Sequence, residues 1–167
     1  MKILTLAFLL TFSAVAQKIE VESDASVDFA KFKTFAIRDG RLNSTNPSLN
    51  SELVRKRIDA DIIKYLSAKG LEWAGTGRSD LNVRYTLGAV RKSEVEAYPA
   101  GWRGWGTRVV RVPFTEGTLV IDLRDPSTKS LVWRAIARED KSDAAKVEGK
   151  LDDMVKKSFD KYPPKAK

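Results

Sequence analysis

Cysteine and histidine are both absent from the 167 residues of this sequence. Without cysteine, the chain can form no disulfide, no thiolate nucleophile and no haem-attachment motif. Without histidine, it lacks a Ser-His triad, the usual zinc ligands and a side chain that exchanges protons near neutral pH. We therefore expect no cofactor and no metal. A chain of this length folds without cross-links, because it can bury roughly 70% of its unfolded surface.

The longest hydrophobic run lies at the N-terminus, between Lys2 and an Ala-x-Ala pattern formed by Ala14 and Ala16. A charged start, a short apolar run and small residues are typical of a secretory signal peptide. A membrane anchor is the rival interpretation, but the run is shorter than the roughly 20 residues that a spanning helix needs. A lipid anchor would require a cysteine. We expect residues 1–16 to be removed and residues 17–167 to form a single envelope domain, periplasmic or secreted, with no transmembrane helix.

Positive charge exceeds negative charge, with 30 Lys and Arg against 22 Asp and Glu and a formal net charge of +8. Basic proteins favour anionic partners. Because we expect export, nucleic acid is not an expected partner. The anionic candidates outside the cytoplasm are lipid headgroups, lipopolysaccharide and wall polymers. The alternative is that the spread charge only keeps the surface hydrated.

Period-two alternation predicts several strands, most clearly over residues 81–89, where the odd-numbered residues are apolar and face one side. Further strands are expected at 18–23, 31–38, 71–74, 107–114, 118–123 and 131–137, with a loop at 39–47 and a turn at 125–128. Pro113 favours an edge position or a bulge in its strand. Trp73 and Trp133 lie within apolar runs, so both are expected in the core.

Two apolar stripes at helical spacing predict two amphipathic helices. The first stripe consists of Leu49, Leu53, Val54, Ile58, Ile62, Tyr65 and Leu66, and the second of Val147, Leu151, Met154, Val155 and Phe159. We expect the first helix to start with Asn46 as its cap and Pro47 in its first turn, and to stop at Gly70. Ser142 or Asp143 caps the second, which ends before Tyr162-Pro163-Pro164, and its outer face is expected to pair Asp152 with Lys156 and Asp153 with Lys157.

Runs of strands separated by two helices predict the α+β class. The apolar stripes must cover the apolar side of the sheet. The simplest packing is a two-layer sandwich of a mainly antiparallel sheet with two amphipathic helices packed on one face.

Four blocks of sequence carry a family resemblance: 28–37 (DFAKFKTFAI), 79–85 (SDLNVRY), 117–133 (GTLVIDLRDPSTKSLVW) and 161–164 (KYPP). In this order and spacing, over about residues 19–164, the chain resembles the bacterial domain of unknown function 4136 family. The resemblance implies a small α+β envelope domain with no established activity and no catalytic residues. Members are often lipoproteins, whereas this chain has no cysteine after its signal peptide.

The segment 98–106 (YPAGWRGWG) combines three aromatic residues, an arginine and three glycines between two expected strands. Tryptophan rings stack on sugars, fill partner pockets or lie at membrane interfaces. The candidate ligand-binding residues are Tyr98, Trp102, Arg103, Trp105 and Arg108. The alternative is a hairpin tip whose tryptophans fold back on the sheet edge. We expect Trp102 and Trp105 to be more exposed than Trp73 and Trp133.

Carboxylates form four candidate acid–base pairs, Asp24/Asp28, Asp59/Asp61, Asp122/Asp125 and Glu139/Asp140, which a glycoside hydrolase could use. All lie in expected turns, on a solvated helix face or on the polar side of a strand, so no catalytic residue is expected. Asp122 should oppose Val132 or Arg134 across a hairpin, where an arginine can bond it. We expect Asp122 to be a structural acceptor.

The sequence thus favours a non-enzymatic periplasmic or secreted protein that acts by binding. Its partner would be an envelope protein, an anionic envelope polymer or a lipid headgroup, contacted through the aromatic-basic loop. The alternative is an auxiliary subunit of an envelope transport or assembly complex, docking by a sheet edge or a helix face. A carboxylate-based hydrolase is a third hypothesis.

Overall fold

The computed structural model describes residues 17–99, 107–142 and 144–164. Their strands form one six-stranded sheet in the order β1-β6-β5-β4-β2-β3. The strands are β1 Lys18–Ser23, β2 Thr34–Ser44, β3 Glu72–Trp73, β4 Leu81–Pro99, β5 Thr107–Arg124 and β6 Leu131–Ser142. The helices are η1 Phe29–Lys31, η2 Pro47–Leu49, α1 Glu52–Ala68, α2 Ala144–Gly149 and α3 Leu151–Phe159.

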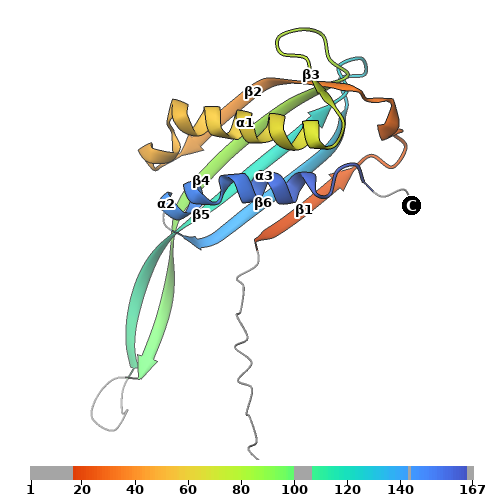
Figure 1. Ribbon diagram of the computed structural model, residues 1–167. Coiled ribbons are helices and arrows are strands. Elements are labelled where there is room, and N and C mark those ends of the chain that lie inside the picture. Colours follow the sequence, from red (N-terminus) through yellow and green to blue (C-terminus); the bar gives the residue numbers. More distant parts are fainter. Residues whose placement is uncertain (1–16, 100–106, 143, 165–167) are drawn as a thin grey trace, which may run out of the picture.

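The sheet is mixed but mostly antiparallel. β1, β6, β5 and β4 pair antiparallel in turn, whereas β2 lies parallel to both β4 and β3. Helix α1 connects β2 to β3, and α1 and α3 lie along the same face of the sheet (Figure 1). The expected α+β two-layer sandwich with both amphipathic helices on one face is confirmed.

The core lies between this sheet face and the helices. The expected alternation is confirmed in β4, where Leu81, Val83, Tyr85 and Leu87 are buried. The same hydrophobic cluster includes residues beside them on β5 and β6 and residues of the helices that cover this face: Leu119, Ile121, Leu123, Trp133, Ala135, Ala137, Val54, Ile58, Ile62, Leu66, Leu151, Met154, Val155 and Phe159. Gly40 on β2 makes room for one of the largest members, because a Cβ at this position would clash with the Tyr85 ring.

The expected boundaries around α1 are partly wrong. β2 continues to Ser44 through the expected loop, because it keeps pairing with β4 as far as Ala89. Asn46 and Pro47 begin η2, and α1 begins later, after its own cap at Ser51. Leu53 then falls on the outer side of the first helical turn and is 77% exposed, so it does not belong to the apolar stripe.

The second expected helix is interrupted at Lys150 and forms two helices, α2 and α3. Its apolar stripe is buried as expected. The Asp153–Lys157 pair is confirmed at 2.8 Å, whereas Lys156 pairs with Asp160. Asp152 turns instead toward α1, where it meets Lys64 at 3.1 Å.

The two tryptophans expected in the core differ. Trp133 is fully buried, which confirms the prediction. Trp73 is 37% exposed, so the prediction for this residue is wrong. It lies on the two-residue edge strand β3 and packs one side against Phe35, with 5.4 Å between ring centroids. Across the described ranges, no helix is both long enough and apolar enough to cross a membrane.

Candidate functional site

β4 and β5 extend beyond the rest of the sheet and form a two-stranded arm, residues 92–99 paired with 107–114. The pairing of β2 with β4 ends at Ala89, and that of β6 with β5 ends at Thr115. Eight successive pairs lie beyond these points. Figure 1 shows the arm projecting away from the helices and from the body of the sheet. At about 3.4 Å per residue, it extends for roughly 27 Å.

Two of the five expected site residues, Tyr98 and Arg108, lie near the far end of this arm. Tyr98 and Arg108 oppose each other as its second-to-last pair. Trp102, Arg103 and Trp105 belong to the connecting segment 100–106, which lies outside the described residues, so their expected exposure stays a prediction. The fold therefore brings Tyr98 and Arg108 together next to the segment that holds the two tryptophans.

The local sequence suits an arm of this kind. Pro113 pairs with Ser93 on one side, and no described strand pairs with it on the other. A proline is tolerated at such an edge because its missing N–H would have no partner there. The expected edge position of Pro113 is confirmed.

Asp122 has the structural role expected of it. It lies directly opposite Arg134 in the β5–β6 ladder. The two side chains form a bidentate pair, with Nε to Oδ1 and Nη2 to Oδ2 both at 2.7 Å. These hydrogen bonds raise the pKa of Arg134. An aligned guanidinium–carboxylate pair is among the stronger polar contacts in proteins and fixes the register of the two strands.

Other carboxylates of the candidate pairs are also held in local contacts. Asp24 accepts from Ser26, and Asp28 accepts from the Ala30 amide. Asp59 accepts from the Tyr85 hydroxyl at 2.6 Å. Hydrogen bonds, chiefly from the Ser127 hydroxyl, lower the pKa of Asp125 to about 2.

One carboxylate pair was not expected from the sequence: Asp61 on α1 and Asp152 on α3. Asp61 is 9% exposed, and its burial, followed by the charge of Asp152, raises its pKa to about 6. Asp152 accepts from the Tyr65 hydroxyl at 2.9 Å, and this bond contributes most to lowering its pKa. The residues lie far apart in the chain, so no local pattern pairs them. Among the described residues, no group of acidic side chains could hold a metal ion.

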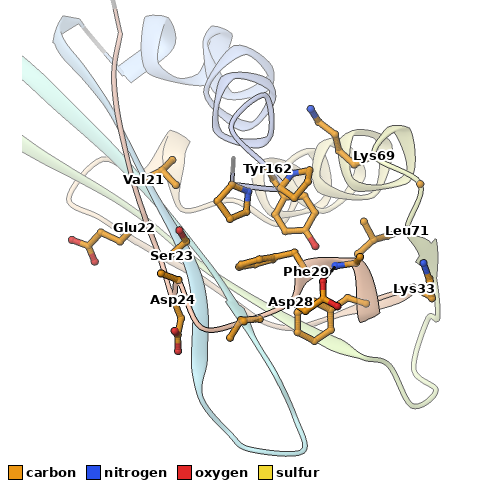
Figure 2. A pocket seen from close by; sticks show the side chains of 17 residues that line it. Val21, Glu22, Ser23, Asp24, Asp28, Phe29, Lys33, Lys69, Leu71 and Tyr162 are labelled. Atoms are coloured by element: carbon orange, nitrogen blue, oxygen red, sulfur yellow. Dashed lines mark hydrogen bonds between the residues drawn. The ribbon is translucent and has the colours of Figure 1, made fainter. Parts of the chain in front are cut away.

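A cavity of about 1020 Å³ was also not expected. It lies between the end of β1, η1, the turn after α1 and the C-terminal Tyr162-Pro163-Pro164 (Figure 2). Its aromatic wall contains Phe29, Phe32 and Tyr162. The rings of Phe29 and Tyr162 meet edge to face at 5.8 Å, and Tyr162 meets Trp133 in the same way at 5.8 Å. The wall is thus continuous with the core.

No signal in the sequence marks this cavity, because its lining comes from three segments: 21–33, 69–71 and 162–164. In the sequence, Gly70 and Pro163 indicate only where a helix ends. Their second role, in shaping the cavity, follows from the tertiary fold alone.

Several solved structures share this fold at low sequence identity. A PDZ domain protein from Parabacteroides distasonis has a TM-score of 0.60 at 18% identity over 88% of this chain. The match covers 35% of that protein, so this chain spans about a third of its length. PelC from Paraburkholderia phytofirmans, solved as a dodecamer, has a TM-score of 0.53 at 11% identity, covering 86% of this chain and 95% of PelC.

A putative neuraminyllactose-binding hemagglutinin homolog from Helicobacter pylori has a TM-score of 0.52 at 9% identity, covering 87% of this chain and 94% of that one. A comparison with curated proteins finds no match. Residues 19–164 match the family described as Domain of unknown function (DUF4136). This match confirms the resemblance carried by the four blocks at 28–37, 79–85, 117–133 and 161–164. The chain belongs to the DUF4136 family.

Proposed function

We propose that this protein is a non-enzymatic envelope protein, periplasmic or secreted, that binds an envelope component or a partner protein through the arm. Tyr98, Trp102, Arg103, Trp105 and Arg108 would form the contact. The observation that carries the proposal is the projection of eight strand pairs beyond every other described strand.

An arm of this length lies outside the hydrophobic core and adds little to the stability of the domain. A two-stranded ribbon is only marginally stable by itself in water. Its backbone edges are open to pairing with another chain. Tyrosine, tryptophan and arginine are the residues most enriched among those that dominate binding energies. Both the shape of the arm and the composition of its end therefore favour a binding role.

Location in the envelope rests on the N-terminal residues, which have the pattern of a signal peptide. If residues 1–16 are a signal peptide, exported material begins at Gln17. Intact-mass measurement of the exported protein tests this step, and a retained Met1 would contradict it.

The arm can be removed without touching the core. Residues 92–114 can be replaced by Asn-Gly, which favours a tight turn between Arg91 and Thr115, opposite each other in the ladder. The shortened protein should keep its thermal midpoint and lose the partners that the full mature protein captures from envelope extract. Trp102→Ala/Trp105→Ala should lose the same partners. Trp73→Ala is the matched control, because Trp73 is a partly exposed tryptophan outside the arm. Equal capture by all four proteins would contradict the proposal.

A second candidate is an auxiliary subunit of an envelope transport or assembly complex. The observation that favours it is the shared fold with PelC, which was solved as a dodecamer. β1 ends the sheet on one side and offers an edge for such docking. A partner that co-purifies equally with the shortened protein, or self-assembly that survives removal of the arm, would support this candidate over the first.

The non-enzymatic part of the proposal is supported by the contacts of five candidate carboxylates, which accept hydrogen bonds from backbone or side-chain groups: Asp24, Asp28, Asp59, Asp122 and Asp125. Asp61 is the exception with a raised pKa. Hydrolysis of an envelope polymer by the mature protein, abolished by Asp61→Asn in a folded variant, would instead support the hydrolase hypothesis.

A further inference from the structure

We propose that the cavity between β1, η1 and the C-terminal Tyr162-Pro163-Pro164 binds a single-chain anionic amphiphile such as a fatty acid. The apolar chain would lie on the aromatic wall, and the anionic head would lie near the Tyr162 hydroxyl and the amines of Lys33 and Lys69. This inference does not depend on the arm.

The size and lining of the cavity suit a small apolar ligand. Its volume of about 1020 Å³ is near the upper end of the range for small-molecule sites, roughly 300–1,000 Å³. Val21, Val27 and Phe29 line it and are only partly buried, although they pack against the core. Apolar surface that the fold leaves partly exposed here is surface that a ligand can cover.

The wall is held in place before any ligand binds. Phe29 packs edge to face against both Phe32 and Tyr162, with centroids 6.1 and 5.8 Å apart. Phe32 and Tyr162 are themselves buried. A preformed site binds more tightly than one that must be ordered by its ligand, because fewer side chains lose freedom on binding.

A polar group is available inside this apolar surface. The Tyr162 side chain is 3% exposed overall, and its hydroxyl has no hydrogen-bond partner within the described part of the chain. Figure 2 shows this hydroxyl pointing into the cavity, on the side where Leu71 lies. Burial raises the pKa of Tyr162 to about 12, so the group stays a neutral donor. It can donate a hydrogen bond to a carboxylate oxygen of a ligand.

The lining carries charges of both signs, two lysines and three carboxylates. The amines of Lys33 and Lys69 are exposed and make no ion pair with a described residue. Among the carboxylates, Asp24 and Asp28 accept hydrogen bonds from Ser26 and Ala30, and Figure 2 shows the carboxylate of Glu22 directed away from the cavity. We therefore assign the anionic head to the side of the Tyr162 hydroxyl and the lysines, and the net positive charge of the chain attracts an anion at longer range.

Calorimetric titration of the mature protein with monomeric dodecanoate tests the proposal. We expect one dodecanoate per chain. Butyrate, which has the head without the chain, should bind at least tenfold more weakly, since each methylene buried adds up to about fourfold in affinity. Dodecyltrimethylammonium, which has the chain with a cationic head, should also bind at least tenfold more weakly. Equal affinity for the cationic and the anionic amphiphile would overturn the assignment of the head group.

Two pairs of variants localise the site. Ala30→Trp places a large side chain at an exposed position of the lining and should abolish dodecanoate binding, whereas Ala60→Trp, on the exposed side of α1, should not.

The second pair tests the head group. Lys33→Glu/Lys69→Glu should weaken dodecanoate binding at least tenfold and leave binding of the cationic amphiphile unchanged. Lys56→Glu/Arg84→Glu makes the same change in net charge elsewhere and should have little effect on either. Circular dichroism checks that each variant is folded.

Other occupants give different results. If the protein binds vesicles containing phosphatidylglycerol but not monomeric dodecanoate, the surface recognises a membrane and the proposal is wrong. If the mature protein is a dimer that Ala30→Trp dissociates, with no dodecanoate bound, the cavity is an interface between two copies and the proposal is wrong. Unchanged dodecanoate affinity in folded Ala30→Trp also overturns it.

Discussion

Asp61 has an unusual environment for a carboxylate. It is nearly buried where α1 meets α3, and its pKa is raised to about 6, first by burial and then by Asp152. Lys64 and Arg57 act in the opposite direction from its own helix. Burying a carboxylate disfavours its charged form unless it is well paired. The folded protein therefore holds a proton on Asp61 at acidities where the unfolded chain has released it.

This difference predicts the direction of a pH effect. Between the ordinary pKa of 3.8 and about 6, the folded state binds more protons at Asp61 than the unfolded state, so stability from this residue falls as pH rises through that window. Asp61→Asn removes this loss. Relative to the unmodified protein, the variant should gain stability from about pH 4 to about pH 7, measured by urea unfolding.

Asp160→Asn is the control for this measurement, because Asp160 is an exposed carboxylate paired with Lys156 on α3. It should show no comparable gain with rising pH. If Asp61→Asn instead lost stability relative to the unmodified protein over the same range, Asp61 would act as a stabilising charge and its raised pKa would be wrong.

The two described tryptophans should differ strongly in their contributions to stability. Trp133 stacks on Phe159 at 5.5 Å and is fully buried, so Trp133→Ala should cost about 3–5 kcal/mol. Trp73→Ala removes a ring that is 37% exposed and should cost about 1 kcal/mol. Equilibrium urea unfolding measures both. Comparable losses would mean that β3 is as well packed as β6.

Residue-level patterns predicted Trp133 and Asp122 correctly, because each lies on a strand that is paired on both sides. Trp73 was predicted wrongly for a physical reason. Its neighbours look apolar in the chain, but β3 is two residues long and lies at the edge of the sheet, where one side of the ring has no neighbour to cover it.

At the scale of elements, α1 shows how two start signals can compete. Asn46 caps η2 by accepting from the Ser48 amide at 3.0 Å, and Ser51 caps α1 by accepting from the Val54 amide at 3.2 Å. The helical spacing of the apolar residues predicts one long helix that starts at the first signal, Asn46. Both caps form, and tertiary packing determines which of the two helices is long.

Ser51→Ala should therefore destabilise α1 directly. Loss of an N-terminal cap costs about 0.5–2 kcal/mol, because a backbone N–H loses its acceptor. Ser67→Ala is the matched control, since Ser67 is an exposed serine near the end of the same helix. Hydrogen exchange of the Val54 amide should accelerate in Ser51→Ala and stay unchanged in Ser67→Ala. An unchanged rate in both variants would show that Ser51 does not cap α1 in solution.

β5 shows why strand boundaries were harder to predict than strand existence. Pro113 and Gly117 divide its pattern, and the sequence suggested two strands. The structure has one, because Pro113 lies where only β4 pairs with it. A Cβ on Gly117 would lie 2.6 Å from Cγ1 of Val147, so this glycine allows α2 to approach the strand. A residue that looks like a break is required by a contact distant in sequence.

At the scale of the whole molecule, the class and the layers were predictable, whereas the strand order was not. Local patterns indicate which side of a strand is apolar, but they cannot determine that β2 lies parallel to β4 or that β1 pairs with β6. The cavity depends on that order, because β1 and the C-terminal residues must meet beside η1. The arm depends on where the neighbouring strands stop. Neither site could be derived from spacing along the chain.

The two faces of the sheet give the last prediction. α1 and α3 cover one face, and no described helix covers the other, which bears Val120 next to the buried Leu119. Leu119→Ala should cost about 2–5 kcal/mol by leaving a cavity in the core. Val120→Ala should cost about 1 kcal/mol, because Val120 is only partly buried. Urea unfolding at low and high protein concentration distinguishes an exposed face from a covered one. A cost for Val120→Ala that grows with concentration would show that a second copy covers this face, and the auxiliary-subunit candidate would then be favoured over binding through the arm.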